Sequence, residues 1–164
     1  MQKFEPCAGS ERNACSAYPR DAMNVVVDAS VVLKWLVVEE DSETALLVRA
    51  DHDIAAPDLL LIECRNALLT KVRRRELQRT EAEQAQGALE EIGSGITVLP
   101  SIAMLHQAFV IALDLAEPIY DCIYLAAALA TDRKLITADV RFAAKVARLR
   151  FAQNQIALLH LLPT

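Results

Sequence analysis

The sequence has little of what marks fibrous, low-complexity or membrane-spanning chains. Only four of its 164 residues are glycine and six are proline, which excludes collagen-like and low-complexity proteins. No stretch approaches the roughly 18 uninterrupted apolar residues that a membrane-spanning helix needs, so no membrane association is expected. Aromatic residues are few, whereas aliphatic residues dominate. This composition suits helices packed on a sheet, in one domain with a sizeable core.

The cysteines and the overall charge further limit the classes of protein with which the sequence is compatible. The four cysteines form no CxxC pair and no metal-ligand spacing. Cys64 and Cys122 lie inside apolar helical patterns, where cysteine acts as a small hydrophobe. Because no disulfide is required, the sequence fits a cytoplasmic location. The net charge of −5 does not attract nucleic acid, so a polyanionic partner would need a local basic patch, a metal ion, or both.

Residues 1–22 differ from the rest of the chain. They carry mixed charge and two prolines, show no periodicity, and lack the apolar segment of a signal peptide. We interpret them as a disordered extension, or as the product of a start codon placed too far upstream, in which case Met23 is the natural start. Residues 23–164 are expected to form one domain.

From Asn24 onward, short apolar strands alternate with helices. Strands are expected at residues 24–29, 53–57, 96–100, 134–139 and 155–161, the last of them edge-like. Helices are expected at residues 30–40, 41–51, 58–77, 80–95, 101–116, 119–133 and 140–149, with Ser30 as an N-cap and a Thr80–Glu83 capping box. This alternation predicts an α/β fold with a parallel sheet covered on both faces. In such sheets the working site lies beyond the carboxyl ends of the strands, near the switch in strand order.

Four carboxylates stand out because their neighbours in the sequence are apolar. Asp28 and Asp139 come at the ends of expected strands, whereas Glu63 and Asp121 lie in apolar helices. Burying an unpaired carboxylate costs several kcal/mol, so a fold rarely keeps one without compensation. Converged carboxylates repel one another unless a cation lies among them, and oxygen ligands favour Mg²⁺ or Mn²⁺. We therefore predict that the four acids share a crevice and hold such an ion.

Each acid also has a structural explanation that stays open at this point. Asp28 and Asp139 are placed to cap the helices that follow them. Asp121 lies in the first turn of its helix, where the helix dipole favours a negative charge. Glu63 can form a salt bridge with an arginine of its own helix.

The helix expected at residues 58–77 carries a second signal. Glu63, Asn66 and Thr70 fall at helical spacing on one polar stripe, which runs toward a basic cluster. The cluster consists of Lys71, Arg73, Arg74 and Arg75. A metal ion at one end and cations at the other could track a phosphate backbone. The alternative is a solvated helix end, where the dipole favours cations.

Four segments resemble the motif blocks of PIN-domain ribonucleases, and above all those of the VapC-type toxins of bacterial toxin–antitoxin pairs. The segments are VVVDASVVLKWL, APDLLLIECRNALL, YDCIYLAAALA and LITADVRF, in that order. The resemblance covers the chain from about Met23 onward. It implies a three-layer α/β/α fold with a central parallel sheet of about five strands, and an acidic site that binds Mg²⁺ or Mn²⁺.

The resemblance also implies roles for residues and for partners. Asp28, Glu63, Asp121 and Asp139 match the acidic quartet of the family, Ser30 and Thr137 match the hydroxyl residues beside it, and Asn66 matches a polar neighbour of the glutamate. The implied activity is Mg²⁺-dependent cleavage of RNA by the toxin of a type II toxin–antitoxin system. A cognate antitoxin that inhibits the enzyme, and a homodimer, are implied with it.

Other functions compete with this one. A phosphotransferase of the haloacid-dehalogenase type needs a second aspartate two residues after the first, where this chain has Ser30. A signalling receiver domain needs an adjacent acidic pair after the first strand, which the sequence lacks. A non-catalytic RNA- or protein-binding module on the same fold stays open, as does a housekeeping PIN nuclease without an antitoxin. His52, His106 and His160 are isolated, so no histidine base is expected.

Overall fold

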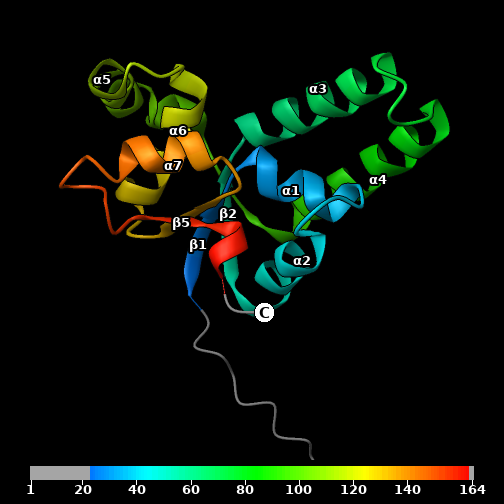
Figure 1. Ribbon diagram of the computed structural model, residues 1–164, viewed down its shortest axis with the longest axis horizontal. Coiled ribbons are helices and arrows are strands. Elements are labelled where there is room, and N and C mark those ends of the chain that lie inside the picture. Colours follow the sequence, from blue (N-terminus) through cyan, green and yellow to red (C-terminus); the bar gives the residue numbers. More distant parts are fainter. Residues whose placement is uncertain (1–22, 163–164) are drawn as a thin grey trace, which may run out of the picture.

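The computed structural model describes residues 23–162, so the predictions for residues 1–22 lie outside the described part of the chain (Figure 1). Its strands are β1 (Asn24–Val27), β2 (Asp53–Pro57), β3 (Thr97–Leu99), β4 (Lys134–Thr137) and β5 (Ile156–Leu158). Its α-helices are α1 (Ala29–Leu36), α2 (Ser42–Asp51), α3 (Leu59–Arg73), α4 (Arg79–Gly95), α5 (Leu105–Leu115), α6 (Ile119–Ala130) and α7 (Val140–Val146). Two short 3₁₀ turns, η1 (Ser101–Ala103) and η2 (Leu159–Leu161), complete the described elements.

The five strands pair in parallel, in the order β3-β2-β1-β4-β5. Val25, Val26 and Val27 of β1 are fully buried, as are Leu135 and Ile136 of β4. A run of β-branched and aliphatic residues without polar alternation is typical of strands that are covered on both faces. The predicted parallel sheet is therefore confirmed, with the last strand at its edge.

Helices cover both faces of this sheet. Figure 1 shows α1 to α4 on one side of the strands and α5 to α7 on the other. The division follows from right-handed crossovers, because the chain moves from β1 to β3 in one direction and then returns to β4 and β5 in the other. The three-layer α/β/α fold is thus confirmed, and the switch in strand order lies between β1 and β4.

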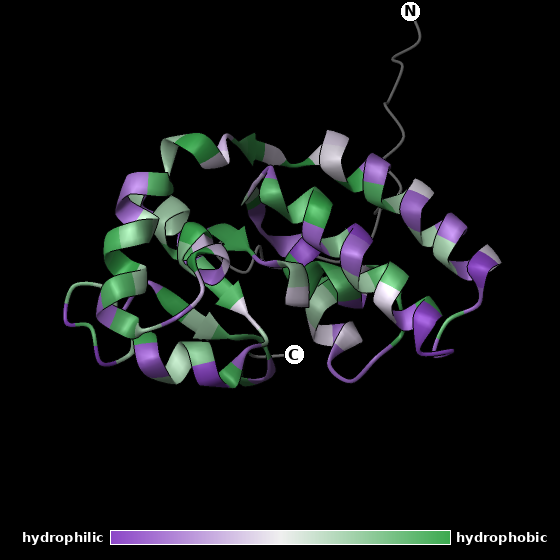
Figure 2. Cartoon of the chain, turned by 90° about the horizontal axis from the view of Figure 1, so that it is seen from above, coloured by the Kyte–Doolittle hydropathy of each residue, from purple (hydrophilic) through white to green (hydrophobic). Residues whose placement is uncertain are grey.

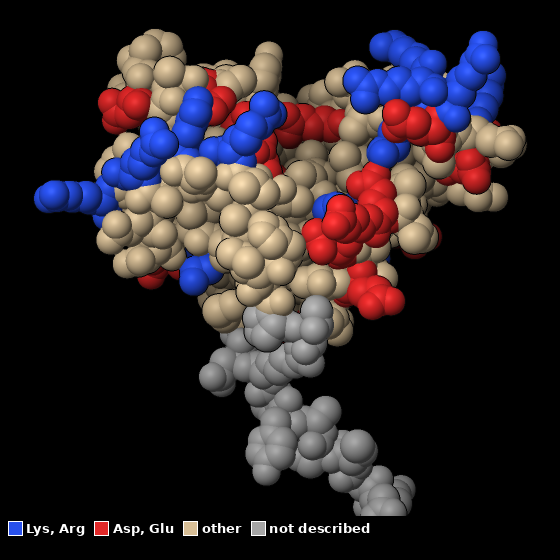
Figure 3. All heavy atoms as spheres, in the orientation of Figure 1, with Lys and Arg blue, Asp and Glu red and all other residues tan. Residues whose placement is uncertain are grey.

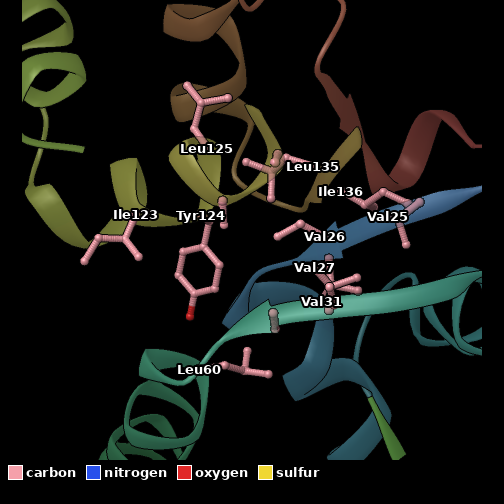
Figure 4. Close-up of a cluster of buried hydrophobic side chains, with 14 of the residues drawn as sticks. Val25, Val26, Val27, Val31, Leu60, Ile123, Tyr124, Leu125, Leu135 and Ile136 are labelled. Atoms are coloured by element: carbon pink, nitrogen blue, oxygen red, sulfur yellow. The ribbon is translucent and has the colours of Figure 1, made fainter. Parts of the chain in front are cut away.

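The core is mostly aliphatic and centres on α6. This helix has seven consecutive buried residues, Cys122 to Ala128, and it contacts β1, β2 and β4. Figure 4 shows its side chains gathered with those of β1 and β4, while the Tyr124 hydroxyl is directed toward α3. Cys64 and Cys122 are free and buried, as expected of small core residues. The all-apolar pattern of α6 is explained by this central position.

Helices α3 and α4 form a hairpin that projects from the sheet (Figure 1). The chain leaves α3 through Arg75, which has a φ of 62°. Hydrophilic residues dominate the far end of the hairpin, where the two helices meet (Figure 2). None of the helices within residues 23–162 is long and apolar enough to cross a membrane.

The predicted N-cap of the first helix was wrong. Asp28, and not Ser30, is the N-cap of α1, and its Oδ1 accepts a hydrogen bond from the Val31 N–H at 3.2 Å. The helix begins one residue earlier than predicted, which places Ser30 in its first turn. The Ser30 hydroxyl is therefore free to contact neighbouring segments.

The predicted capping box of the fourth helix was also wrong. Gln78 and Glu81 form it, and the Gln78 N–H donates to Glu81 Oε2 at 2.7 Å. The carboxylate of Glu83, expected to pair with Thr80, instead accepts a hydrogen bond from Arg79 Nε at 2.8 Å. A glutamine thus takes the N-cap position that serine or threonine usually occupies in a capping box, and the helix begins at Arg79, before Thr80.

Candidate active site

The switch between β1 and β4 brings two of the predicted acids to adjacent strands. Asp28 directly follows β1, and Asp139 comes two residues after β4. Val27 of β1 is paired with Ile136 of β4, so both carboxylates leave the sheet at the same edge. This is the position at which open parallel sheets place their ligand sites.

Both of these acids also cap a helix, so the structural explanation left open above holds as well. Asp28 accepts from the Val31 N–H, and Asp139 Oδ1 accepts from the N–H groups of Arg141 and Phe142 at 2.8 and 3.0 Å. Capping through one oxygen fixes the carboxylate at the sheet end.

Two hydroxyl side chains tie the ends of β1 and β4 together. Ser30 Oγ donates to Asp28 Oδ1 at 2.5 Å and accepts from the Ala138 N–H at 2.9 Å. Thr137 is fully buried, and its Oγ1 accepts from the Asp139 N–H at 2.9 Å. Both hydroxyls that the resemblance singled out therefore lie against the acids.

Glu63 reaches the same region from α3. It is half-buried in the second turn of the helix, and its Oε2 accepts a hydrogen bond from the Tyr124 hydroxyl of α6 at 2.5 Å. Burial raises the pKa of Glu63, the Tyr124 hydrogen bond opposes that rise, and the negative charge of Asp28 adds to it. The two acids are thus close enough for their charges to interact.

Asp121, in the first turn of α6, lies at the centre of the acidic group. Burial, and then the charges of Glu63, Asp139, Asp28 and Glu117, together raise its pKa to about 6. Burial and the four negative charges therefore all act on Asp121 in the same direction. A carboxyl among several acids fits a site that attracts a positive ion.

Asp28 is subject to opposing effects. Burial raises its pKa, whereas hydrogen bonds from Ser30, Thr137 and the Val31 N–H favour the charged form. Hydrogen bonds to a carboxylate stabilise its charge at the cost of fixing its orientation. Asp28 is therefore held as an oriented, half-buried carboxyl group.

These residues fit a divalent ion by their chemistry but not by their present arrangement. The donor set consists of carboxylate oxygens, which Mg²⁺ and Mn²⁺ prefer, and the acids raise the pKa of Asp121 by their charges. However, within residues 23–162 no group of three or more acidic, histidine or cysteine side chains is arranged so that it could hold a metal ion. Like charges repel, and three of the acids hydrogen-bond to their own neighbours instead. The chemistry of the side chains fits an ion, while their present arrangement within residues 23–162 does not form a metal-binding group.

The remaining predicted residues lie farther out. Asn66 is exposed, one helical turn beyond Glu63 on α3. Lys71 forms ion pairs with Glu39 and, at 3.8 Å, with Glu76, so its charge is already balanced. The other members of the basic cluster, Arg73, Arg74 and Arg75, are exposed at the end of α3. Ten residues of helix place that end about 15 Å from Glu63.

Two residues of this site were not predicted. Tyr124 holds Glu63, and Glu117 contributes to the raised pKa of Asp121. Tyr124 follows Asp121 at helical spacing, but in the sequence it looks like a core aromatic residue. Only the contact between α3 and α6 reveals its role.

The surface around the site alternates in charge. Figure 3 shows acidic side chains in the notch between the α3–α4 half of the molecule and the α5–α7 half. Basic side chains lie on both rims of the notch, over α7 and over the far ends of α3 and α4. A negatively charged centre between positive rims suits a polyanion that binds together with metal ions.

Comparison with known proteins identifies the family. The model of the PIN domain matches residues 25–148, and the chain belongs to this family. Ribonuclease VapC3 from Pyrobaculum aerophilum is 34% identical over 124 residues, which cover 75% of this chain and 95% of that protein. The resemblance drawn from the four sequence segments is thereby confirmed.

Solved structures agree on the fold. The crystal structure of PAE2754 from Pyrobaculum aerophilum superposes with a TM-score of 0.60 at 21% identity, over 87% of this chain and 93% of that one. A toxin–antitoxin complex from Klebsiella pneumoniae contains a chain with a TM-score of 0.56 at 13% identity, over 82% of this chain and 97% of that one.

Proposed function

We propose that this PIN-domain protein is a Mg²⁺- or Mn²⁺-dependent endoribonuclease and the toxin of a type II toxin–antitoxin system. The observation that carries the proposal is that four acids lie close enough for their charges to interact, at the switch point of a parallel sheet. The sequence identity of 34% to a protein named as a ribonuclease supports the choice of RNA as the substrate.

Each acid has a proposed role. Asp28, Glu63 and Asp121 would hold the ion, and Asp139 would hold a second ion or orient the attacking water. When bound, Mg²⁺ supplies positive charge to the scissile phosphate and lowers the pKa of a water molecule. Asp28 accepts the Ser30 hydrogen bond through Oδ1 and Glu63 accepts that of Tyr124 through Oε2, so the other oxygen of each carboxylate would be available to the ion.

The supporting residues act through the acids. Ser30 and Thr137 orient Asp28 by hydrogen bonding, and Tyr124 orients Glu63. Asn66, one turn along α3 from Glu63, would support the site as a polar neighbour of the glutamate. Arg73, Arg74 and Arg75 would attract the RNA backbone at a distance, because they are exposed and lie beyond the notch.

Cleavage of RNA tests the proposal directly. Purified protein is incubated with total RNA in Mg²⁺, in Mn²⁺ and in EDTA, beside the Asp28→Asn variant. We expect cleavage by the wild type with either metal, and loss of cleavage in EDTA or on substitution. Cleavage that survives both EDTA and Asp28→Asn would refute a metal mechanism. RNA binding without cleavage under all conditions would favour the non-catalytic module.

The antitoxin has a candidate docking groove between α3 and α4. The groove has a volume of about 570 Å³, and Leu68, Leu69, Val72 and Ala82 form its apolar part. Arg65, Arg79 and Glu83 also line it, which suits an amphipathic helical segment of a small protein. The likeness to a chain of a toxin–antitoxin complex supports this occupant.

The neighbouring gene provides the test of this partner. A small open reading frame that overlaps or adjoins this gene upstream is expected, and its product should co-purify with this chain and suppress cleavage. Leu69→Asp should weaken co-purification, whereas Leu46→Asp, an equally exposed site on α2, should not. Cleavage without any such neighbour would favour a housekeeping nuclease.

The proposed homodimer has a separate surface. Ile102, Phe109 and Leu113 lie on η1 and α5 and are 79%, 56% and 68% exposed, and such a cluster of large apolar side chains favours burial. A second copy could cover it with the same face, which gives a closed two-fold dimer. Light scattering should show a dimer that Leu113→Glu converts to a monomer.

A further inference from the structure

A second cavity opens beside the acids, on the α7 side of the notch. Its volume is about 380 Å³, and Asp121 and Asp139 belong to its lining. Two cations of α7, Arg141 and Lys145, line it as well. The cavity therefore adjoins the acidic site and has both acidic and basic side chains in its lining.

The position of Arg141 is fixed, but its charge is not used. Its backbone N–H donates to Asp139 Oδ1 at 2.8 Å, which places the residue directly beside a site acid. Its exposed side chain makes no hydrogen bond or ion pair with any residue in the described range. Although acids line the same cavity, the guanidinium pairs with none of them.

Lys145 lies one helical turn farther along the same face of α7. Its Nζ pairs with Glu117 at 2.5 Å, and its side chain is still 40% exposed. This ion pair holds the end of α7 against the loop before α6. Lys145 thus adds positive charge to the cavity while its own position is anchored.

We propose that Arg141, supported by Lys145, binds the phosphate adjacent to the scissile phosphate of a single-stranded RNA. The inference rests on the proposed ribonuclease function and assigns the path of the substrate, which runs from the acids along α7. The protein has a net charge of −5, so each phosphate that lies near the site needs a local cation. The guanidinium offers two parallel donors that match phosphate oxygens.

The basic cluster at the end of α3 is too far away to supply a cation for a phosphate at the site. It lies about 15 Å along the helix from Glu63. Arg141, by contrast, is two residues from Asp139 in the sequence and shares a cavity with it. An acidic segment of a protein partner is the rival occupant, but its carboxylates would face Asp121 and Asp139. An RNA chain that binds together with divalent ions would place its phosphates against Arg141 and Lys145 and the ions against Asp121 and Asp139.

Binding of a short, fluorescently labelled oligouridine tests the inference. Fluorescence anisotropy is measured with Ca²⁺ in place of Mg²⁺, at several salt concentrations, for the wild type and for three variants. Arg141→Gln should raise the Kd about five- to tenfold and lower the salt slope by about one. Arg141→Lys should restore most of the affinity. The matched control Arg148→Gln removes an exposed charge that lies outside the cavity and should bind like the wild type.

Kinetics in Mg²⁺ separate this inference from the function on which it rests. For the wild type and for Arg141→Gln we expect similar kcat values and a KM that rises with the Kd. Equal affinities of Arg141→Gln and Arg148→Gln overturn the inference, even if the wild type cleaves RNA. If the wild type does not cleave RNA with either metal, the proposed function fails, and the anisotropy comparison still decides the inference. Arg141-dependent binding of polyglutamate, without such binding of oligouridine, would replace RNA with an acidic protein partner.

Discussion

The Tyr124 hydroxyl donates a hydrogen bond of 2.5 Å to Glu63 Oε2, and it joins residues that are 61 positions apart in the chain. Tyr124 is only 2% exposed, so this hydroxyl is the polar end of a core side chain. The bond fixes α3 relative to α6 at the point where each helix carries a site acid. The core and the candidate active site are therefore directly connected.

Removal of this hydroxyl should weaken metal-dependent activity. In Tyr124→Phe, Glu63 loses the donor that orients it, while the aromatic ring still fills the core. Groups that orient metal ligands typically contribute 10- to 100-fold to metal affinity or activity, so we expect the Mg²⁺ concentration for half-maximal cleavage to rise about tenfold. Tyr120→Phe is the matched control, because Tyr120 lies on the same helix and is exposed. Equal Mg²⁺ requirements for the two variants would contradict this role.

Neutralising Asp121 should stabilise the protein when metal is withheld. The charges of four acids act on Asp121, so Asp121→Asn removes repulsion from the folded state. In EDTA at neutral pH we expect a gain of about 1 kcal/mol, which is about 2–4 °C in Tm for a chain of this size. Asp114→Asn, at an exposed site on α5, should have little effect. Added Mg²⁺ should raise the Tm of the wild type more than that of Asp121→Asn. A variant that melts at or below the wild-type temperature in EDTA would argue against clustered acids.

The same residue predicts a pH dependence of stability. The folded carboxyl of Asp121 has a pKa raised to about 6 from the ordinary 3.8, so between these values the folded state binds more protons than the unfolded state. Its contribution therefore destabilises the fold as pH rises from about 4 to about 6, and it is constant above that range. Because Asp121 is half-buried, we expect about 1–2 kcal/mol rather than the full value. Thermal melts of the wild type and Asp121→Asn in EDTA should diverge over this pH range and coincide below pH 4. Parallel curves over the whole range would contradict the assigned pKa.

Loss of the Ser30 hydroxyl should destabilise the sheet end. Ser30→Ala removes the acceptor of the Ala138 N–H and a donor to Asp28 in one step. An unsatisfied polar group of this kind costs about 1–3 kcal/mol. Denaturant unfolding should show this loss, while Ser94→Ala, whose exposed hydroxyl donates to the Glu90 carbonyl, should change stability by less than about 0.5 kcal/mol. Cleavage activity should fall with Ser30→Ala because Asp28 is less firmly oriented. Unchanged stability would show that the hydroxyl does not join the two strands.

The fold could be predicted because its signals are local. The valines of β1 and the Leu135–Ile136 pair of β4 indicate buried strands by composition alone, and the helices between them require parallel pairing. Helix starts were less predictable. The 3₁₀ turn from Ser101 to Ala103 precedes α5, so this helix begins at Leu105 and not at residue 101. Several capping patterns coexist in one stretch, and tertiary contacts select one of them.

The site was predictable only in part. Asp28 and Asp139 are marked by their positions after strands, which topology brings together. Tyr124 and Arg141 carry no such mark, because their roles depend on which face of α6 meets α3 and on which side of α7 faces the notch. The detailed arrangement of the carboxylates could not be predicted from the sequence either, because it depends on the balance between their hydrogen bonds and their mutual repulsion.

The pairing of β1 with β4 has a consequence for biosynthesis. Asp28 is translated early, but the strand that completes its surroundings, and the acid that follows that strand, are among the last parts of the domain to be made. Domains fold as units, and long-range strand pairing waits for the whole unit. A nascent chain on the ribosome therefore carries Asp28, Glu63 and Asp121 before the strand that completes their site exists, and the site cannot assemble until β4 has emerged.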